Sequence, residues 1–563
     1  MGIRGLDTFI KTKVKNGTRN VKVDQEIQQE KQKTGKDVLL VIDLDSMMNH
    51  CCTIDAEMLC GMRTEVYCAR IDEFFQKLLI AGAKLIFFSD GPPQDDKHPT
   101  WIQRQNRKYE EQLAVIDKIE HHVPLREILA AGCPTTTLIG SVLRKKAKKY
   151  GSLHISMDNE CDLELAAFAT KNAAFAVLGD DSDFLIYAGE WQYWSVKQMD
   201  EEKMTTTAYN RAALRAHLAL SQEQMPVFGA LGGNDIVQFE DIKGFHNRIG
   251  WRDKFDNIAH YVRPLPLNFV EREEIFDKIT RDVFSHRSDW QKFKSFLKSG
   301  IEIYNYNSIK SEKRTEFLQK LLENNLTDAF ALFKQYPYTS TTLFQDMRDT
   351  SKKPYSQMAL EIRAKMVGAM FKNVNDPNLQ MKVVIKMSHE DPYRQILWKP
   401  NYPIFNVPSP EKLIFRDPND GLDEKRKEIL RWILLGSHFI PLNTDRLFSL
   451  PQELILPVAT LFYLVKEGNL SIYLADILLL TVLNSANVHM DPPEYLFKDA
   501  FTASFLYLKM FQFLVKVFKV IGLRDFAPTV KFDGYLFHKL HQQNLKFCNI
   551  DVRQIENLRI FYQ

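Results

Sequence analysis

The first 250 residues alternate short apolar runs with segments of helical periodicity, and this alternation constrains the fold more than any other feature. Near-continuous apolar runs at residues 38–42, 84–88 and 174–178 are typical of strands buried on both faces of a sheet. Residues 69–80 have helical spacing and supply a crossover between the first two runs. The pattern predicts an α/β fold with a parallel sheet, whose strands end at one common edge.

Beyond residue 250 the helical patterns dominate. They predict helices at 268–285, 288–299, 310–335, 354–373, 423–436, 451–466, 470–485 and 498–521. The predicted organisation is an α/β domain at 1–250, a helical region at 251–390, a Pro-rich connector at 391–422 and a helical C-terminal domain at 423–563. An apolar stripe in the last helix favours a core over a partner groove and does not indicate a cofactor site: Phe501, Phe505, Leu508, Phe511 and Leu514.

Composition excludes several classes of protein. A formal net charge of +3 over 563 residues gives no global basic excess, so any nucleic-acid surface must be local. The seven cysteines have no metal-ligand spacing and indicate free thiols in a reducing compartment. The start lacks the apolar segment of a secretory signal, and charges interrupt the apolar stretch 454–483. We therefore predict an intracellular protein, nuclear rather than cytoplasmic, without a membrane partner.

Acidic residues recur where the predicted strands end and where the next helices begin. Two follow the strands at 38–42 and 84–88, two open an Ala-rich helix, two follow the strand at 174–178, and one closes a Gly-Gly-Asn turn. In order these residues are Asp43, Asp90, Glu160, Asp162, Asp181, Asp183 and Asp235. Carboxylates gathered without cations resist ionising together, so such a set indicates bound metal.

Each acid also has an ordinary structural explanation, because Asp commonly caps helices and starts turns at strand ends. Acids in the first turn of a helix are also stabilised by its dipole. The combination of all seven positions favours a metal site, and no Lys or Arg interleaves within these segments to neutralise them. Oxygen ligands suit Mg²⁺ or Mn²⁺, and a pair of such ions supports in-line displacement at phosphorus.

Six short motifs follow one another in a fixed order, and the last five of them carry these acids. The motifs are Gly2-Ile-Arg-Gly-Leu6, Val41-Ile-Asp43, Phe88-Ser-Asp-Gly-Pro-Pro93, Glu160-Cys-Asp162, Asp181-Ser-Asp-Phe-Leu185 and Leu231-Gly-Gly-Asn-Asp235. Together they resemble the flap endonuclease/XPG nuclease family, and within it the asteroid branch. The resemblance covers residues 1–245.

The resemblance implies a PIN-like nuclease domain in which the seven acids are catalytic and hold two Mg²⁺ ions, with Mn²⁺ as an alternative. It places the backbone of Gly2 beside that site and gives phosphate contacts to Gly2, Arg104, Arg107 and Lys108. The implied substrates are flap, branched or single-stranded DNA, or RNA. The chain departs from the family at Asp162, where Glu is usual, and at 242–247, where one glycine of a duplex-binding motif remains.

The function predicted from these residues is metal-dependent hydrolysis of phosphodiester bonds. Local basic segments at 1–36 and 144–149 offer phosphate contacts, although a solvated helix face explains the second equally well. A pseudo-nuclease scaffold for nucleic-acid binding or signalling is the main alternative, and a small-phosphate hydrolase is a third. The C-terminal helical region offers a surface for a protein partner.

Overall fold

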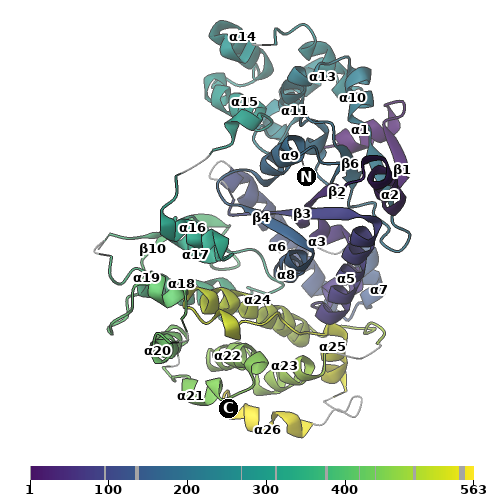
Figure 1. Cartoon of the computed structure of the whole chain (residues 1–563). Helices are drawn as coiled ribbons and strands as arrows, with labels where there is room; N and C mark the ends of the chain where they lie inside the picture. Colours follow the sequence, from purple (N-terminus) through teal and green to yellow (C-terminus); the bar gives the residue numbers. More distant parts are fainter. Residues whose placement is uncertain are drawn as a thin grey trace. The chain divides into compact units, whose positions relative to one another are not determined.

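The computed structural model describes residues 2–93, 97–132, 139–267, 269–310, 313–374, 378–417, 419–437, 439–485, 490–543 and 552–563 (Figure 1). The chain forms two compact units, and each combines segments far apart in sequence. The first unit is Met1–Cys52, Arg70–Thr100 and Leu143–Glu312. The second is Thr53–Ala69, Trp101–Val142 and Lys313–Gln563. The predicted domain boundaries stay predictions.

The first unit is built on a seven-stranded sheet with the order β1-β7-β6-β5-β2-β3-β4. Its strands are β1 (Thr18–Lys22), β2 (Val38–Asp43), β3 (Ala83–Asp90), β4 (Gly151–Ser156), β5 (Ala176–Gly179), β6 (Gln192–Ser195) and β7 (Thr205–Tyr209). The α/β class is confirmed, and the three predicted strands are parallel, but the sheet as a whole is mixed. Strands β2 to β6 are parallel, whereas β7 runs antiparallel to β6 and to β1. The link between β6 and β7 is too short for a crossover helix, so the chain returns as an antiparallel strand.

Alternate side chains of β3 show that helices cover both faces of the sheet. Phe87 packs against Phe75 of α5 (Thr64–Ala81), with ring centroids 5.0 Å apart. Phe88 points the other way and packs against Phe168 of α9 (Cys161–Lys171), at 5.5 Å. Burial on both faces explains why these strands are near-continuous apolar runs.

The other helices of the first unit continue this packing. They are α1 (Leu6–Thr12), α2 (Val23–Thr34), α3 (Leu44–His50), α10 (Arg211–Leu218), α11 (Met225–Gly232), α12 (Phe239–Ile249), α13 (Lys254–Val262), α14 (Glu273–Val283) and α15 (Phe293–Glu302). The helices predicted at 268–285 and 288–299 are confirmed in α14 and α15. Helices α5, α6 (His98–Glu120) and α8 (Gly140–Tyr150) contain residues of both units.

The second unit is mostly helical, as predicted. Its helices are α4 (Asp55–Leu59), α7 (Leu125–Ala130), α16 (Glu316–Glu323), α17 (Thr327–Phe333), α18 (Tyr355–Met370), α19 (Pro410–Ile414), α20 (Asp423–Ile433), α21 (Thr444–Phe448), α22 (Gln452–Lys466), α23 (Ile472–Asn484), α24 (Lys498–Val520), α25 (Gly534–Gln542) and α26 (Glu556–Arg559). The single helix predicted at 310–335 is instead the pair α16 and α17. The chain turns between them at Asn325, whose φ is 57°.

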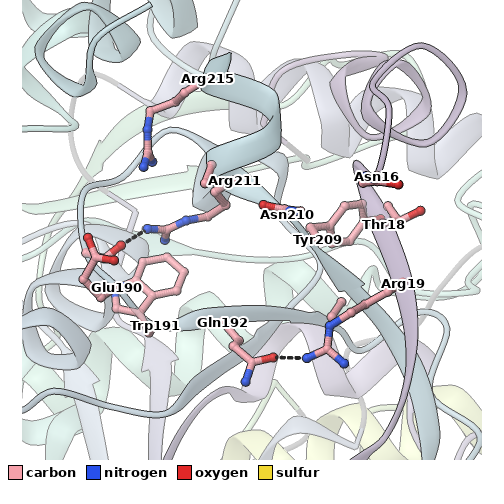
Figure 2. Close-up of a pocket in the computed structure, with 13 residues that line it drawn as sticks. Asn16, Thr18, Arg19, Glu190, Trp191, Gln192, Tyr209, Asn210, Arg211 and Arg215 are labelled. Carbon is pink, nitrogen blue, oxygen red and sulfur yellow. Dashed lines mark hydrogen bonds between the residues drawn. The ribbon is translucent and has the colours of Figure 1, made fainter. Parts of the chain in front are cut away.

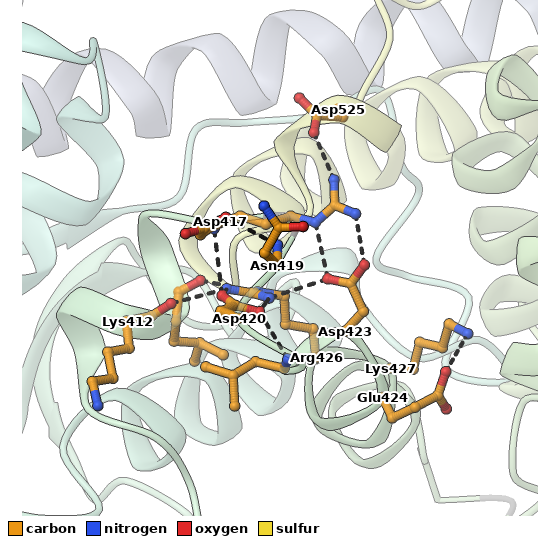
Figure 3. A network of polar contacts seen from close by, with 12 residues as sticks. Lys412, Asp417, Asn419, Asp420, Asp423, Glu424, Arg426, Lys427 and Asp525 are labelled. Carbon is orange, nitrogen blue, oxygen red and sulfur yellow. Dashed lines mark hydrogen bonds and ion pairs between the residues drawn. The ribbon is translucent and has the colours of Figure 1, made fainter.

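Three strands were not predicted in this unit: β8 (Tyr338–Thr339), β9 (Met381–Ile385) and β10 (Arg394–Trp398). Strand β10 and helix α19 lie within 391–422, so this segment is not uniformly extended. An ion network also orders it (Figure 3). The fully buried Arg426 donates to Asp420 at 2.7 and 3.0 Å, to Asp423 at 3.1 Å and to the Lys412 carbonyl at 2.9 Å. Pro418, one of the prolines behind the connector prediction, lies outside the described residues.

Helices α22, α23 and α24 pack together in the core of the second unit (Figure 1). The apolar stripe predicted as core is confirmed, because all five of its side chains are buried. Among the described residues, α24 has the length and composition of a membrane span, but 72% of its most apolar window is buried inside the protein. That burial is what a core helix shows.

Candidate metal centre

The seven predicted acids all belong to the first unit, and most lie where its parallel strands end. Asp43 and Asp90 are the last residues of β2 and β3. Asp181 follows β5 and precedes the 3₁₀ turn η2 (Ser182–Leu185), which contains Asp183. The remaining three are at helix ends: Glu160 and Asp162 at the start of α9, and Asp235 just after α11.

Two of these acids also cap helices, so the ordinary structural explanation holds for part of the set. Asp43 is the N-cap of α3, and its Oδ1 accepts from the backbone N–H of Asp45 at 2.9 Å and of Ser46 at 3.3 Å. Asp181 caps η2 by accepting from the N–H of Asp183 at 2.9 Å. Capping occupies Oδ1 of each carboxylate and fixes its direction.

Gly2 lies directly against the carboxylates of η2. A Cβ atom added to Gly2 would fall 2.0 Å from Oδ1 of Asp181, 2.8 Å from Oγ of Ser182 and 2.9 Å from Oδ1 of Asp183. Its φ of 49° is in the left-handed region that favours glycine. The hydroxyl of Ser182 donates to the carbonyl of Ile3 at 3.1 Å and ties the two segments together. The chain start therefore lies at the acidic cluster.

Lys97, which lies outside the acid-bearing segments, brings a cation to these acids that their own sequence does not supply. Its Nζ lies 2.5 Å from Oε2 of Glu160 and 3.4 Å from Oδ2 of Asp235. Burial lowers the pKa of Lys97, but the charges of Glu160 and Asp235 outweigh this and hold it above its ordinary value. Sequence inspection missed Lys97 because its two partners are 63 and 138 residues away along the chain.

Asp45 is a further acid of this site that the sequence reasoning missed. Its Oδ2 accepts from the hydroxyl of Ser89 at 2.7 Å and from the backbone N–H of Asp90 at 2.6 Å. Arg144 donates from Nε to Ser89 at 2.7 Å and lies 3.6 Å from Asp45. Arg144 therefore packs beside the ends of β2 and β3 rather than on a solvated helix face. Lys146 of the same basic run pairs with a different acid, Asp72.

Tyr304, which follows α15, is a second missed residue. Its buried hydroxyl donates to Oδ1 of Asp183 at 2.9 Å. Asn234 anchors the same region by donating to the carbonyl of Gly300 at 2.8 Å. The hydroxyl of Tyr304 also lies 3.4 Å from Nδ2 of Asn234. A neutral donor on Asp183 fixes this carboxylate without cancelling its charge.

The electrostatics of the cluster show an excess of negative charge. Burial, followed by the charge of Asp45, raises the pKa of Asp43 from 3.8 to about 7. Asp90 is an exposed residue, but neighbouring groups surround its carboxyl. Burial there, and then the charges of Asp45, Asp43 and Glu160, raise its pKa well above the ordinary range.

The carboxyls of α9 and η2 show the same imbalance. Burial and then the charge of Asp181 raise the pKa of Asp162 and that of Asp183 well above the ordinary range. Lys97 acts in the opposite direction on both groups, but it does not cancel the shift. Four carboxyls of the cluster thus resist ionisation unless more positive charge is supplied.

The donor set fits a hydrated Mg²⁺ or Mn²⁺ ion. All seven side chains offer oxygen, and Mg²⁺ keeps several waters while binding one or two carboxylates directly. A tight cage is not present, since among the described residues no three of these carboxylates bring their oxygens within 4.8 Å of one another. The group that meets this distance is Cys51, Cys52 and Glu201, but burial raises the pKa of Cys51 and opposes a metal-binding thiolate.

The shifted pKa of Asp43 predicts a pH-dependent stability for the metal-free protein. Between about pH 4 and 7 the folded state keeps a proton that the unfolded chain releases, so the free energy of unfolding falls as the pH rises. Above pH 7 the loss is complete. Thermal unfolding in EDTA should show this fall, and Mg²⁺ should stabilise the protein more at pH 8 than at pH 5.

Asp43→Asn is the matched control, because Asn also caps helices but does not titrate. This variant should show a smaller fall in stability between pH 4 and 7. An unchanged pH profile would mean that Asp43 is not the titrating group.

Three predicted phosphate contacts are not part of this unit. Arg104, Arg107 and Lys108 lie on α6 in the second unit. Arg107 is exposed and pairs with Glu111 at 3.4 Å, whereas Lys108 is partly buried and burial lowers its pKa. Their role at phosphate stays a prediction.

Comparisons with known proteins give partial matches. Residues 218–308 match the family model of the FAM120A-like domain, a segment that contains Asp235 and Tyr304. A curated relative, the constitutive coactivator of peroxisome proliferator-activated receptor gamma of Homo sapiens, is 26% identical over 242 residues, which is 42% of this chain. The aligned part of this chain spans about a quarter (26%) of that relative's length.

The comparison with solved structures finds nucleases whose TM-scores and sequence identities to this chain are low. The catalytic core of Rad2 in complex with DNA substrate has a TM-score of 0.33 and 16% identity, over 59% of this chain and 95% of that one. The Holliday junction-resolving enzyme GEN1, in complex with product DNA and Mg²⁺, has a TM-score of 0.34 and 12% identity, over 71% of this chain and 95% of that one. Scores at this level do not by themselves support a shared activity.

Proposed function

We propose that this protein is a metal-dependent nuclease that hydrolyses phosphodiester bonds in nucleic acid. The observation that carries the proposal is the convergence of seven acids on one unit, four of them with raised pKa values despite the charge of Lys97. A cluster held in this state is costly unless divalent cations bind it, and the oxygen donors suit Mg²⁺ or Mn²⁺.

In this proposal the seven acids hold two ions, directly or through water: Asp43, Asp90, Glu160, Asp162, Asp181, Asp183 and Asp235. When bound, such ions supply an activated water and stabilise the charge on the phosphate oxygens. The chain's own groups do the positioning. Capping fixes the carboxylates of Asp43 and Asp181, and Tyr304 orients that of Asp183.

Lys97 and Gly2 suit the approach of a substrate phosphate. An ammonium has three N–H donors, and two acids account for two directions at Lys97, so the third can meet a phosphate oxygen. Gly2 packs against Asp181 without a side chain, so its backbone N–H is the group proposed to meet a phosphate oxygen there. Arg104, Arg107 and Lys108 are proposed to contact the flanking strand.

The finer assignments are also proposals. The ordered motifs support the asteroid branch. An intracellular, nuclear location is also a proposal, and the absence of metal-ligand spacing among the cysteines supports only its reducing compartment. DNA is the proposed substrate.

A non-catalytic scaffold is the second candidate, and two observations favour it. Lys97 already supplies an internal cation to Glu160 and Asp235, as would suit a cluster that no longer binds metal. The curated relative is named as a coactivator of a receptor rather than as an enzyme. The four raised pKa values favour the nuclease, because Lys97 and Arg144 together leave most of the acidic charge uncompensated.

A cleavage panel separates these two functions. The full chain is incubated with flap, hairpin and single-stranded DNA, and with single-stranded RNA, in Mg²⁺, in Mn²⁺ and in EDTA. We expect cleavage of at least one DNA substrate with either metal and none in EDTA. Binding of these substrates without cleavage in either metal would support the scaffold instead.

A further inference from the structure

A polar cavity lies at the end of the sheet where the parallel strands begin, whereas the acidic cluster lies where these strands end. The cavity has a volume of about 540 Å³ and is lined by the starts of β1 and β6, the end of β7 and the start of α10 (Figure 2). The register places it there: Gln192, the first residue of β6, pairs with Ala176 at the start of β5, whereas Asp181 follows the end of β5. The cavity is therefore separate from the proposed metal site.

Arg211 is the central group of this cavity. It is only 6% exposed, and its guanidinium carbon lies 3.7 Å from the centroid of the Trp191 ring (Figure 2). Its Nη2 donates to the carbonyl of Gly189. Its Nη1 is buried and has no hydrogen-bond partner among the described residues. A buried guanidinium N–H without an acceptor is costly, so this side chain lacks a partner that a ligand oxygen would supply.

Positive charge gathers around Arg211. Arg215 also lines the cavity, and its Nη1 donates to the neutral amide of Gln222, at 2.9 Å. Burial, and to a lesser extent the charge of Arg215, lowers the pKa of Arg211 to about 10. The third arginine, Arg19, is already balanced by two hydrogen bonds to Glu26, at 2.7 and 3.1 Å. Glu190 also lines the cavity, and its negative charge acts on Arg211 in the opposite direction to Arg215. Arg211 and Arg215 together therefore leave one positive charge in excess of this acid.

The start of α10 adds to this positive potential. Asn210 is its N-cap, and the side-chain oxygen accepts from the N–H of Ala213 at 3.0 Å. Helix N-termini favour anions, since their unpaired N–H groups carry partial positive charge. Paired arginines at such an end match the geometry of phosphate oxygens.

We propose that this cavity binds the phosphoryl group of a ligand of about mononucleotide size. Arg211 and Arg215 contact the phosphate oxygens at the start of α10, and the polar side chains nearer β1 and β6 contact the rest of the ligand. The cavity is within the range of small-molecule sites, about 300–1,000 Å³. This site is independent of the proposed nuclease activity, because it shares no residue with the acidic cluster.

Calorimetric titration of the full chain in EDTA tests the proposal, since EDTA removes metal from the other site. The probes are AMP, inorganic phosphate and adenosine. We expect AMP and phosphate to bind, and AMP to bind more tightly than phosphate. Adenosine should bind at least about tenfold more weakly than AMP. Asp181→Asn should leave AMP binding unchanged, which keeps the result distinct from the outcome for the nuclease.

Two matched substitutions at Asn210 provide the decisive comparison. Asp and Ser both cap helices well, so α10 is retained in each. Asn210→Asp places a negative charge at the phosphate and should weaken AMP binding about tenfold or more. Asn210→Ser should bind AMP like the unmodified chain. Equal affinity in the two variants, equal binding of adenosine and AMP, or no binding of AMP at millimolar concentration would overturn the proposal.

Discussion

Asp181→Asn is expected to lower Mg²⁺-dependent phosphodiester cleavage by on the order of 10³-fold, as for the loss of a preorganised electrostatic contact. Asp181 lies against Gly2 and contributes to the raised pKa of both Asp162 and Asp183. Asn retains the cap on η2 but removes the charge that a metal needs. Single-turnover cleavage at saturating substrate measures the effect on the chemical step.

Asp180→Asn is the matched control for this substitution. Asp180 is the adjacent acid, but its carboxylate faces His50, at 3.4 Å, rather than Gly2. This variant should cleave at nearly the rate of the unmodified chain, and both variants should unfold at similar temperatures. Full cleavage by a pure Asp181→Asn sample would show that the activity does not come from this site.

Gly2→Ala is expected to lower cleavage by about 10²-fold, the order that a 1 Å misplacement at a reacting centre can cost. The added methyl would collide with Oδ1 of Asp181 and with Oδ1 of Asp183, so the chain start or both carboxylates must move. The left-handed φ of Gly2 adds strain of about 1–2 kcal/mol for any L-residue. The same single-turnover assay measures the loss.

Gly5→Ala separates the collision from the strain. Gly5 also has a left-handed φ, 87°, but an added Cβ would meet only a ring carbon of Phe255, at 4.0 Å. Gly5→Ala should therefore lose stability but keep cleavage near that of the unmodified chain. If both variants cleave equally well, the chain start does not shape the site.

The central strands and the acids at their ends could be predicted because local sequence determines both. Strands β2, β3 and β5 are buried on two faces, so they are apolar throughout and easily recognised. Since parallel strands end at one edge, the acids that follow them had to approach one another. Strand β7 was missed because Thr205–Tyr209 has three threonines and no apolar run.

The other residues that contact the cluster could not be predicted, because their contacts are between distant segments. Lys97 meets Glu160 and Asp235 only through the fold, and Tyr304 is 121 residues from Asp183. Asp45 resembles an ordinary first-turn acid of α3. Nothing in its local sequence shows that it accepts from the backbone of Asp90.

The central claim is that the seven acids bind divalent metal, and Mn²⁺ titration followed by electron paramagnetic resonance tests it most directly. At pH 8, where the raised pKa of Asp43 permits ionisation, free Mn²⁺ is measured against total Mn²⁺ for the unmodified chain and for Asp181→Asn. We expect two ions to bind the unmodified chain and the affinity to fall in the variant. No bound Mn²⁺ at millimolar concentration, or identical binding by the two proteins, would contradict the claim.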